Sequence, residues 1–145
     1  MRGVVTWRPP RQRAHPEQDF QIEAATALGW LLPEPYWFTA IGHGGGGSER
    51  GQALKRMGLK PGVLDLLIRG PGLVGWIELK VGHKVASKEQ LALMARFESY
   101  GDKTAVCYCL EEIIDTVRSW GVPLRDRKPD HVMDGLTRSL RELAE

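Results

Sequence analysis

The chain lacks the features of a membrane protein or a secreted protein. No apolar run approaches the roughly 18 residues that are needed to span a bilayer. The first eight residues, MRGVVTWR, contain neither the apolar stretch nor the small-residue cleavage site of a secretory signal. We therefore expect a cytoplasmic protein without a membrane partner.

Cysteine is also scarce, since Cys107 and Cys109 are the only two. Side chains two positions apart on a strand point to the same face, so the pair could form half of a metal site. No second cysteine pair and no His-x3-His partner accompanies them, however. The sequence therefore favours two reduced thiols in a core strand.

Neither sign of charge dominates, because Lys and Arg together number 20, Asp and Glu number 18, and the net charge is +2. Overall charge therefore does not indicate a nucleic-acid-binding protein. Local basic clusters can contact phosphates, although each is also compatible with a solvated face or a flexible tail. The three clusters are Arg2, Arg8, Arg11 and Arg13; Arg50, Lys55, Arg56 and Lys60; and Arg118, Arg125, Arg127 and Lys128.

What the sequence does contain is sufficient for one globular domain, since 42% of the residues are hydrophobic and 26% are charged. Hydrophobic periodicity and turn residues predict the secondary structure. Expected helices cover residues 16–30, 49–57, 87–100, 111–120 and 132–144, and expected strands cover residues 36–41, 63–68, 74–80 and 103–110. This order predicts an α/β fold, with a central mixed sheet flanked by helices and a hairpin at residues 63–80 in its middle.

The chain divides into a basic arm at residues 1–14, a domain at residues 15–120, and a linker with a helical tail at residues 121–145. The glycine-rich stretch at residues 42–48 must be a loop. In the first helix the apolar side chains have the spacing of one buried stripe. They are Phe20, Ala24, Ala27, Leu28 and Leu31.

The residues that carry chemistry lie between apolar neighbours in the predicted hairpin, where acids are disfavoured. They are Asp65 in the first strand and Glu78 in the second, with Lys80 two residues further on. Because side chains alternate along a strand, Glu78 and Lys80 share one face. If the strands pair as a hairpin, Asp65 can face Glu78.

Two carboxylates about 4 Å apart repel by roughly 4 kcal/mol at an effective dielectric of about 20, and a divalent cation removes that repulsion. Oxygen ligands of this kind suit Mg²⁺ or Mn²⁺. Such a cation could polarise a phosphodiester, while Lys80 orients water or stabilises the charge that develops on phosphorus. The alternative is a surface hairpin whose Glu78 and Lys80 are merely solvated, since an E-x-K triplet is frequent by chance.

Spaced motifs around these residues resemble the VRR-NUC family of the PD-(D/E)XK nuclease superfamily. The stretches GLKPGVLDL at residues 58–66, IELK at residues 77–80 and SKEQ at residues 87–90 are similar to that family's G-x-x-P-G-x-P-D, i-E-x-K and S-x-x-Q, in this order. Glu17, Gln21 and the glycine-rich stretch before a Leu-Lys-x-x-Gly helix also match. The resemblance covers residues 15–120.

The resemblance implies a restriction-endonuclease-like PD-(D/E)XK core that hydrolyses DNA phosphodiesters with Mg²⁺ or Mn²⁺. Asp65 and Glu78 would be metal ligands, the Leu79 carbonyl would be a third, and Lys80 would be the catalytic lysine. Stand-alone viral and bacterial members are similar to dimeric enzymes that cleave branched DNA such as four-way Holliday junctions. Members embedded in larger eukaryotic repair proteins cut flaps or crosslinked DNA.

The sequence departs from the family pattern at two positions. Leu64 stands where the family has proline, and a hydrophobic residue can maintain the strand. The family's N-G-G-x-R stretch is replaced by His43 and four glycines, so Arg50 becomes the candidate DNA contact. His43 could touch a phosphate or cap the loop, and both roles remain open.

On the first helix, Gln21 lies about 40° from Glu17 around the axis, whereas Glu23 lies about 120° away. The two acids therefore cannot serve the same site. The family's E-x-x-x-Q pattern matches Glu17 and Gln21, which implies that Glu17 is an additional catalytic acid that binds the metal or its water and that Gln21 contacts DNA. Glu23 should face solvent.

Gln90 has two open roles. Ser87 and Gln90 form a capping box, with Gln90 at the third helical position. The family resemblance instead implies that Gln90 holds a phosphate or a water molecule in the active site. Lys55, Lys84 and Lys88 are candidates for contacts with the DNA backbone, and a solvent-exposed lysine is the alternative for each.

Three functions fit these observations. The first is a structure-selective endonuclease that resembles a Holliday-junction resolvase and acts as a homodimer. The second is a non-catalytic DNA-binding module, against which the intact Asp65, Glu78 and Lys80 argue. The third is the nuclease subunit of a repair or restriction complex that a partner targets. A C-terminal leucine stripe could serve a dimer interface or pack on its own domain; it contains Leu136, Leu140 and Leu143.

Overall fold

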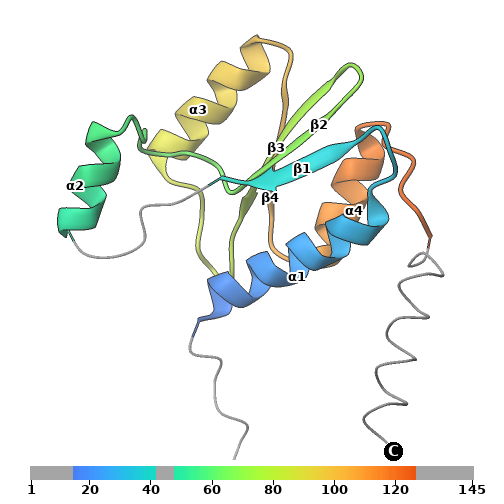
Figure 1. The fold of residues 1–145 in the computed structure, drawn as a ribbon, viewed down its shortest axis with the longest axis horizontal. Helices are drawn as coiled ribbons and strands as arrows, with labels where there is room; N and C mark the ends of the chain where they lie inside the picture. Colours follow the sequence, from blue (N-terminus) through green and yellow to red (C-terminus); the bar gives the residue numbers. More distant parts are fainter. Residues whose placement is uncertain (1–14, 42–47, 127–145) are drawn as a thin grey trace, which may run out of the picture.

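The computed structural model describes residues 15–41 and 48–126 (Figure 1). Within these ranges the elements are, in chain order, α1 (Pro16–Leu31), β1 (Trp37–Ala40), α2 (Ser48–Arg56), β2 (Leu66–Gly70), β3 (Leu73–Leu79), α3 (Lys88–Ser99), β4 (Lys103–Cys107) and α4 (Leu110–Ser119). The predicted arm, the glycine loop with His43, and the predicted C-terminal helix with its leucine stripe lie outside the described residues.

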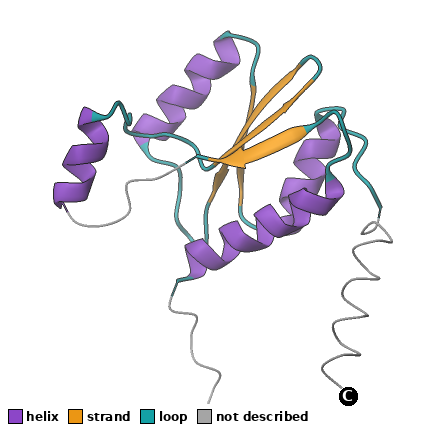
Figure 2. Ribbon diagram, in the orientation of Figure 1, coloured by secondary structure: helices purple, strands orange, loops and turns teal. Residues whose placement is uncertain are grey.

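The described strands form one mixed sheet in the order β1-β2-β3-β4. β1 pairs antiparallel with β2, β2 pairs antiparallel with β3, and β3 pairs parallel with β4. β2 and β3 form the predicted hairpin, which turns at residues 71–72. The α/β prediction, with a mixed sheet flanked by helices, is therefore confirmed (Figure 2).

Helices cover both faces of this sheet. On one face, Ile77 and Leu79 of β3 join the buried cluster that α1 and α4 also supply. On the other face, Trp76 stacks on Phe97 of α3 with ring centroids 4.6 Å apart. Because side chains alternate along a strand, Glu78 lies on the α3 side of β3.

The helix α1 agrees closely with its sequence prediction. Pro16 occupies its first turn, which needs no amide donor there. Glu23 is exposed, as predicted. Neither α1 nor any other helix in the described ranges is long and apolar enough to cross a membrane. All five residues of the predicted stripe are buried: Phe20, Ala24, Ala27, Leu28 and Leu31.

The expectation that both cysteines lie in a core strand is wrong. β4 ends at Cys107, where its partner β3 ends at Leu79. Cys107 is buried, and burial raises the pKa of its thiol. Cys109 instead precedes α4 as its N-cap residue and is only half-buried.

The predicted linker after residue 120 contributes to the core. Val122 and Leu124 are buried and belong to the main hydrophobic cluster. The Arg125 amide donates a hydrogen bond to the Leu31 carbonyl at 2.9 Å, which ties this segment to the end of α1. The packed core therefore extends past the predicted domain boundary.

Candidate metal centre

Asp65, Glu78 and Lys80 meet at one end of the β2–β3 hairpin. Glu78 lies within β3, and Lys80 follows directly after its last residue. The antiparallel register pairs Leu66 with Ile77, so the next positions outward are Asp65 and Glu78. The expectation that Asp65 faces Glu78 across the hairpin agrees with this register.

Asp65 is not inside the strand, as the sequence analysis expected, but immediately before it. The paired part of β2 runs from Leu66 to Gly70, three residues later than predicted at its start. The reason is that the Asp65 carboxylate, instead of a backbone carbonyl, accepts the next hydrogen bond from β3. Its Oδ2 accepts a hydrogen bond from the Leu79 amide at 2.7 Å, and its own carbonyl accepts one from the Ile41 amide at 2.9 Å.

Glu78 is the one buried charged side chain in the described ranges, with 3% of its surface exposed. Its Oε1 accepts a hydrogen bond from Gln90 Nε2 at 2.6 Å and lies 3.0 Å from the Lys80 ammonium. Its Oε2 is buried and has no hydrogen-bond partner among the residues that the structure describes. The carboxylate is thus satisfied on one oxygen only.

The surroundings of Glu78 shift its acid–base equilibrium towards the protonated form. Burial raises the pKa of Glu78 above its ordinary value, and the Asp65 carboxylate raises it further. The Lys80 ammonium and the Gln90 amide act in the opposite direction without cancelling the effect of burial. The metal-free fold therefore holds this carboxylate at a cost.

We expect Glu78→Gln to raise the melting temperature of the protein in EDTA at neutral pH, by about 4 °C for a gain of about 1 kcal/mol. A raised pKa means that the folded state binds more protons than the unfolded state, so stability falls as pH rises above the ordinary glutamate value of 4.5. Glutamine removes this loss. Thermal melts of both proteins between pH 4 and 8 should diverge with rising pH, and parallel curves would contradict the prediction.

Gln90 forms the predicted capping box and also contacts Glu78. Its Oε1 accepts a hydrogen bond from the Ser87 amide at 2.9 Å, while Ser87 Oγ accepts one from the Gln90 amide at 3.1 Å. This is the predicted capping box at the start of α3. The Gln90 Nε2 at the same time donates to Glu78. One side chain therefore links the helix cap to the candidate centre.

The two roles of Gln90 can be separated by comparison with Ser87. Ser87→Ala removes the side-chain cap alone and should cost about 1 kcal/mol of stability. Gln90→Ala should cost a similar amount and also release the Glu78 carboxylate. We therefore expect chemical denaturation to report similar losses, whereas only Gln90→Ala lowers the rate of the DNA hydrolysis that the sequence resemblance implies. Equal rates of hydrolysis in the two variants would show that Gln90 only caps α3 and does not support the candidate centre.

The loop before Asp65 is held against the start of α3. Gly62 has a left-handed backbone with φ of 78°, and a Cβ atom there would lie 2.7 Å from the backbone carbon of Glu89. Glycine alone combines this conformation with so close an approach. The Pro-Gly turn of the sequence motif thus packs the segment leading to Asp65 onto the helix that carries Gln90.

Glu17 is not grouped with the other two acids. Its half-exposed carboxylate forms an ion pair with Lys84, which lowers the pKa of Glu17. No cluster of three or more His, Cys, Asp or Glu side chains suited to a metal occurs in the described ranges. Glu17 and Lys84 instead join the start of α1 to the segment between β3 and α3.

The remaining candidate DNA contacts lie on three helices. Arg50 and Lys55 are exposed on α2, which lies at the edge of the molecule in Figure 1. Lys88 is the exposed first residue of α3 and shares its first turn with Gln90. Gln21 is half-buried on α1. Lys88 is therefore close to the candidate centre along the chain of α3, whereas the α2 pair belongs to a separate element.

Two contacts that shape the site were missed by sequence reasoning. The Leu79 amide that holds Asp65 is a backbone donor and has no signature in the sequence. The Tyr108 hydroxyl donates to the Lys84 carbonyl at 2.8 Å and fixes the segment between β3 and α3. The position of Tyr108 directly after β4 is the only signal that could have indicated it.

The site thus combines a buried acid, a second acid that immediately precedes the neighbouring strand, and a lysine at its edge. Carboxylate oxygens are suitable ligands for a hard divalent cation. Comparisons with protein-family models, curated proteins and solved structures gave no significant match to this chain.

Proposed function

We propose that this chain is a divalent-metal-dependent DNA endonuclease whose active centre consists of Asp65, Glu78 and Lys80. The observation that carries the proposal is the buried Glu78 Oε2, which has no hydrogen-bond partner in the described chain. A buried, unpaired carboxylate oxygen is costly. A cation shared with Asp65 would offset that cost.

The residues fit Mg²⁺ or Mn²⁺. Mg²⁺ is usually bound by one or two carboxylates together with oxygens of the substrate phosphate, so a centre with fewer than three acids is compatible with it. Asp65 and Glu78 would hold the ion, with the Leu79 carbonyl as a further ligand. When bound, the ion would supply Lewis acidity to a phosphodiester and neutralise the charge that develops during its hydrolysis.

Lys80 is suited to act on the substrate itself. Its ammonium lies 3.0 Å from Glu78 Oε1, and its side chain is 17% exposed, so it lies between the buried acid and solvent. From this position the two donors that do not face Glu78 can bind a phosphate oxygen and orient an attacking water molecule. Gln90 acts as a positioning residue, because it holds Glu78 Oε1 and leaves Oε2 to the cation.

The sequence resemblance and the fold support a specific class of nuclease. A mixed sheet flanked by helices agrees with the PD-(D/E)XK core that the resemblance implies. The three motifs supply the acid pair, the lysine and the glutamine, which lie together in the structure. We therefore propose a VRR-NUC-type enzyme that acts on branched DNA such as four-way junctions.

We also propose that the active form is a homodimer. A domain this small offers limited surface for gripping branched DNA, and two symmetric centres would suit the two strands of a symmetric junction. Cross-linking of the full-length chain in the presence of a junction tests this part separately from catalysis.

The substrate can be identified by incubating the full-length protein and Mn²⁺ with end-labelled four-way junction, flap, splayed-arm and linear duplex DNA of equal length. Paired symmetric cuts in the junction are the expected products. A preference for flaps would agree with the proposed metal centre but would indicate repair intermediates, and not junctions, as the substrate. Binding without any cut would favour the non-catalytic module or a nuclease that depends on a targeting partner.

A further inference from the structure

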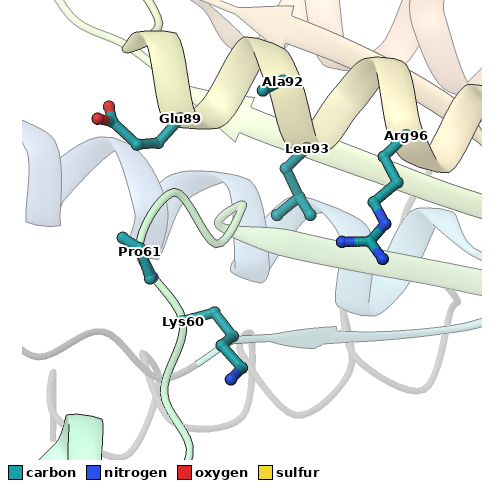
Figure 3. Close-up of a pocket in the computed structure, with 6 residues that line it drawn as sticks. All are labelled: Lys60, Pro61, Glu89, Ala92, Leu93 and Arg96. Carbon is teal, nitrogen blue, oxygen red and sulfur yellow. The ribbon is translucent and has the colours of Figure 1, made fainter.

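A pocket of about 380 Å³ lies between α3 and the loop that precedes β2 (Figure 3). Its wall on α3 is formed by residues three or four positions apart, which share one face of a helix. The residues that line the pocket are Lys60, Pro61, Glu89, Ala92, Leu93 and Arg96.

The pocket shares its supporting elements with the candidate centre. The loop that carries Lys60 continues through Gly62, which packs on α3, to Asp65. The helix that carries Arg96 begins with the turn that carries Gln90. Arg96 lies six residues after Gln90, or about 9 Å along the helix axis. A DNA strand that runs parallel to α3 would cover this distance with about two or three nucleotides, since it rises about 3.4 Å per nucleotide.

The chemistry of the pocket fits a nucleotide backbone. Arg96 Nε donates a hydrogen bond to the Tyr100 hydroxyl at 2.8 Å, which orients the guanidinium group. Lys60 supplies a second cation from the loop that faces α3, and Pro61 and Leu93 supply apolar surface (Figure 3). Figure 3 shows the Glu89 carboxylate pointing away from these two cationic groups, so it does not neutralise them inside the pocket.

We propose that this pocket binds one backbone phosphate of the DNA strand, about two or three nucleotides from the cleaved bond. Lys60 and Arg96 share the phosphate, and the adjoining deoxyribose packs on Pro61 and Leu93. The inference rests on the proposed function, because DNA is the ligand. It assigns to Arg96, which has no place in the sequence motifs, the task of setting the path of the strand.

The test measures DNA affinity by fluorescence anisotropy with the full-length chain and a labelled four-way junction in EDTA, so that no cleavage occurs. Lys60→Gln, Arg96→Gln and the double variant are compared with Lys103→Gln. Lys103 is an exposed lysine at the start of β4, whereas the candidate centre adjoins the end of that strand. Circular dichroism melts verify that all four variants fold.

Each pocket variant should bind about fivefold more weakly than the wild type, since an exposed ion pair contributes about this factor at most. The double variant should lower the slope of log affinity against log salt by about 0.9, the value for one phosphate contact, and each single variant should lower it by less. Because both cations hold the same phosphate, the double variant should lose less than the product of the single losses. Lys103→Gln should change affinity by less than about twofold.

Two results would overturn the proposed phosphate site. In the first, the pocket variants bind DNA as tightly as the wild type. In the second, the two single losses of affinity multiply in the double variant, and each is no larger than the loss in Lys103→Gln. If the wild type binds DNA through the pocket but never cleaves it, the phosphate site stands and the proposed nuclease activity is refuted. A wild type that cleaves DNA while the pocket variants bind and cleave equally well would refute the pocket alone.

Discussion

Asp65→Asn is expected to lower the single-turnover rate of DNA cleavage by about 1,000-fold, which corresponds to about 4 kcal/mol of lost transition-state stabilisation. The substitution keeps the shape of the side chain. An asparagine oxygen can still accept the hydrogen bond from the Leu79 amide, so the hairpin should remain folded. What is lost is the negative charge that would hold the cation together with Glu78.

The control for this prediction is a distant acid, Asp102, whose carboxylate accepts a hydrogen bond from Trp76 Nε1 at 2.8 Å. Asp102 lies just before β4, whereas the candidate centre adjoins the other end of that strand. Asp102→Asn should retain wild-type cleavage. A folded Asp65→Asn protein that cleaves at more than about one tenth of the wild-type rate would remove Asp65 from the active centre.

Lys80→Met is expected to lower the cleavage rate by about 100- to 1,000-fold, the range found when one charged or hydrogen-bonding group that stabilises a transition state is removed. Methionine retains an apolar stem of similar length but has no ammonium. The expected loss is in the rate at saturating Mn²⁺, while the Mn²⁺ concentration for half-maximal activity changes little, because Lys80 is not a ligand. Both quantities come from one series of single-turnover reactions.

The comparison variant is Lys84→Met, which removes an exposed lysine that pairs with Glu17. We expect Lys84→Met to stay within about fivefold of the wild type, as for the loss of an exposed ion pair. Equal losses in the two variants would mean that Lys80 contributes only general positive charge. A Lys80→Met enzyme with an unchanged rate would leave the lysine a structural partner of Glu78.

The sequence was sufficient to predict most of the fold. The apolar spacing in residues 16–31 predicted α1 and its buried face. The prediction succeeded because the apolar side chains of this stripe all pack into the core. Pro71 and Gly72 predicted the hairpin turn, and alternation along β3 predicted that Glu78 and Lys80 share a face. These features depend on the spacing of nearby residues, which can be read from the sequence alone.

The features that were not predicted depend on contacts between distant segments. Asp65 leaves the strand because its side chain binds the Leu79 amide, and a sequence pattern does not show which backbone donor an acid will meet. Cys109 lies outside β4 because the parallel partner ends at Leu79. Gln90 both caps α3 and holds Glu78, a combination that requires the distance between two elements.

The pairing of Glu17 with Lys84 is a further example. The motif on α1 implied an acid that serves the metal, but the fold brings that acid against a lysine 67 residues away. Helical periodicity correctly separated Glu17 from Glu23, since only the direction of each side chain was at issue. It could not specify the partner, because the position of the segment between β3 and α3 depends on Tyr108 and β4.

The most direct test of the proposed centre is the metal dependence of cleavage by the purified full-length chain. Labelled four-way junction DNA is incubated with the wild type and with Glu78→Gln in Mg²⁺, in Mn²⁺ and in EDTA. The account predicts that the wild type cuts with either metal, that EDTA abolishes the cuts, and that Glu78→Gln is inactive although it melts at a higher temperature. Cleavage by the wild type that persists in EDTA, or full activity of Glu78→Gln, would contradict a metal-dependent centre at Asp65 and Glu78.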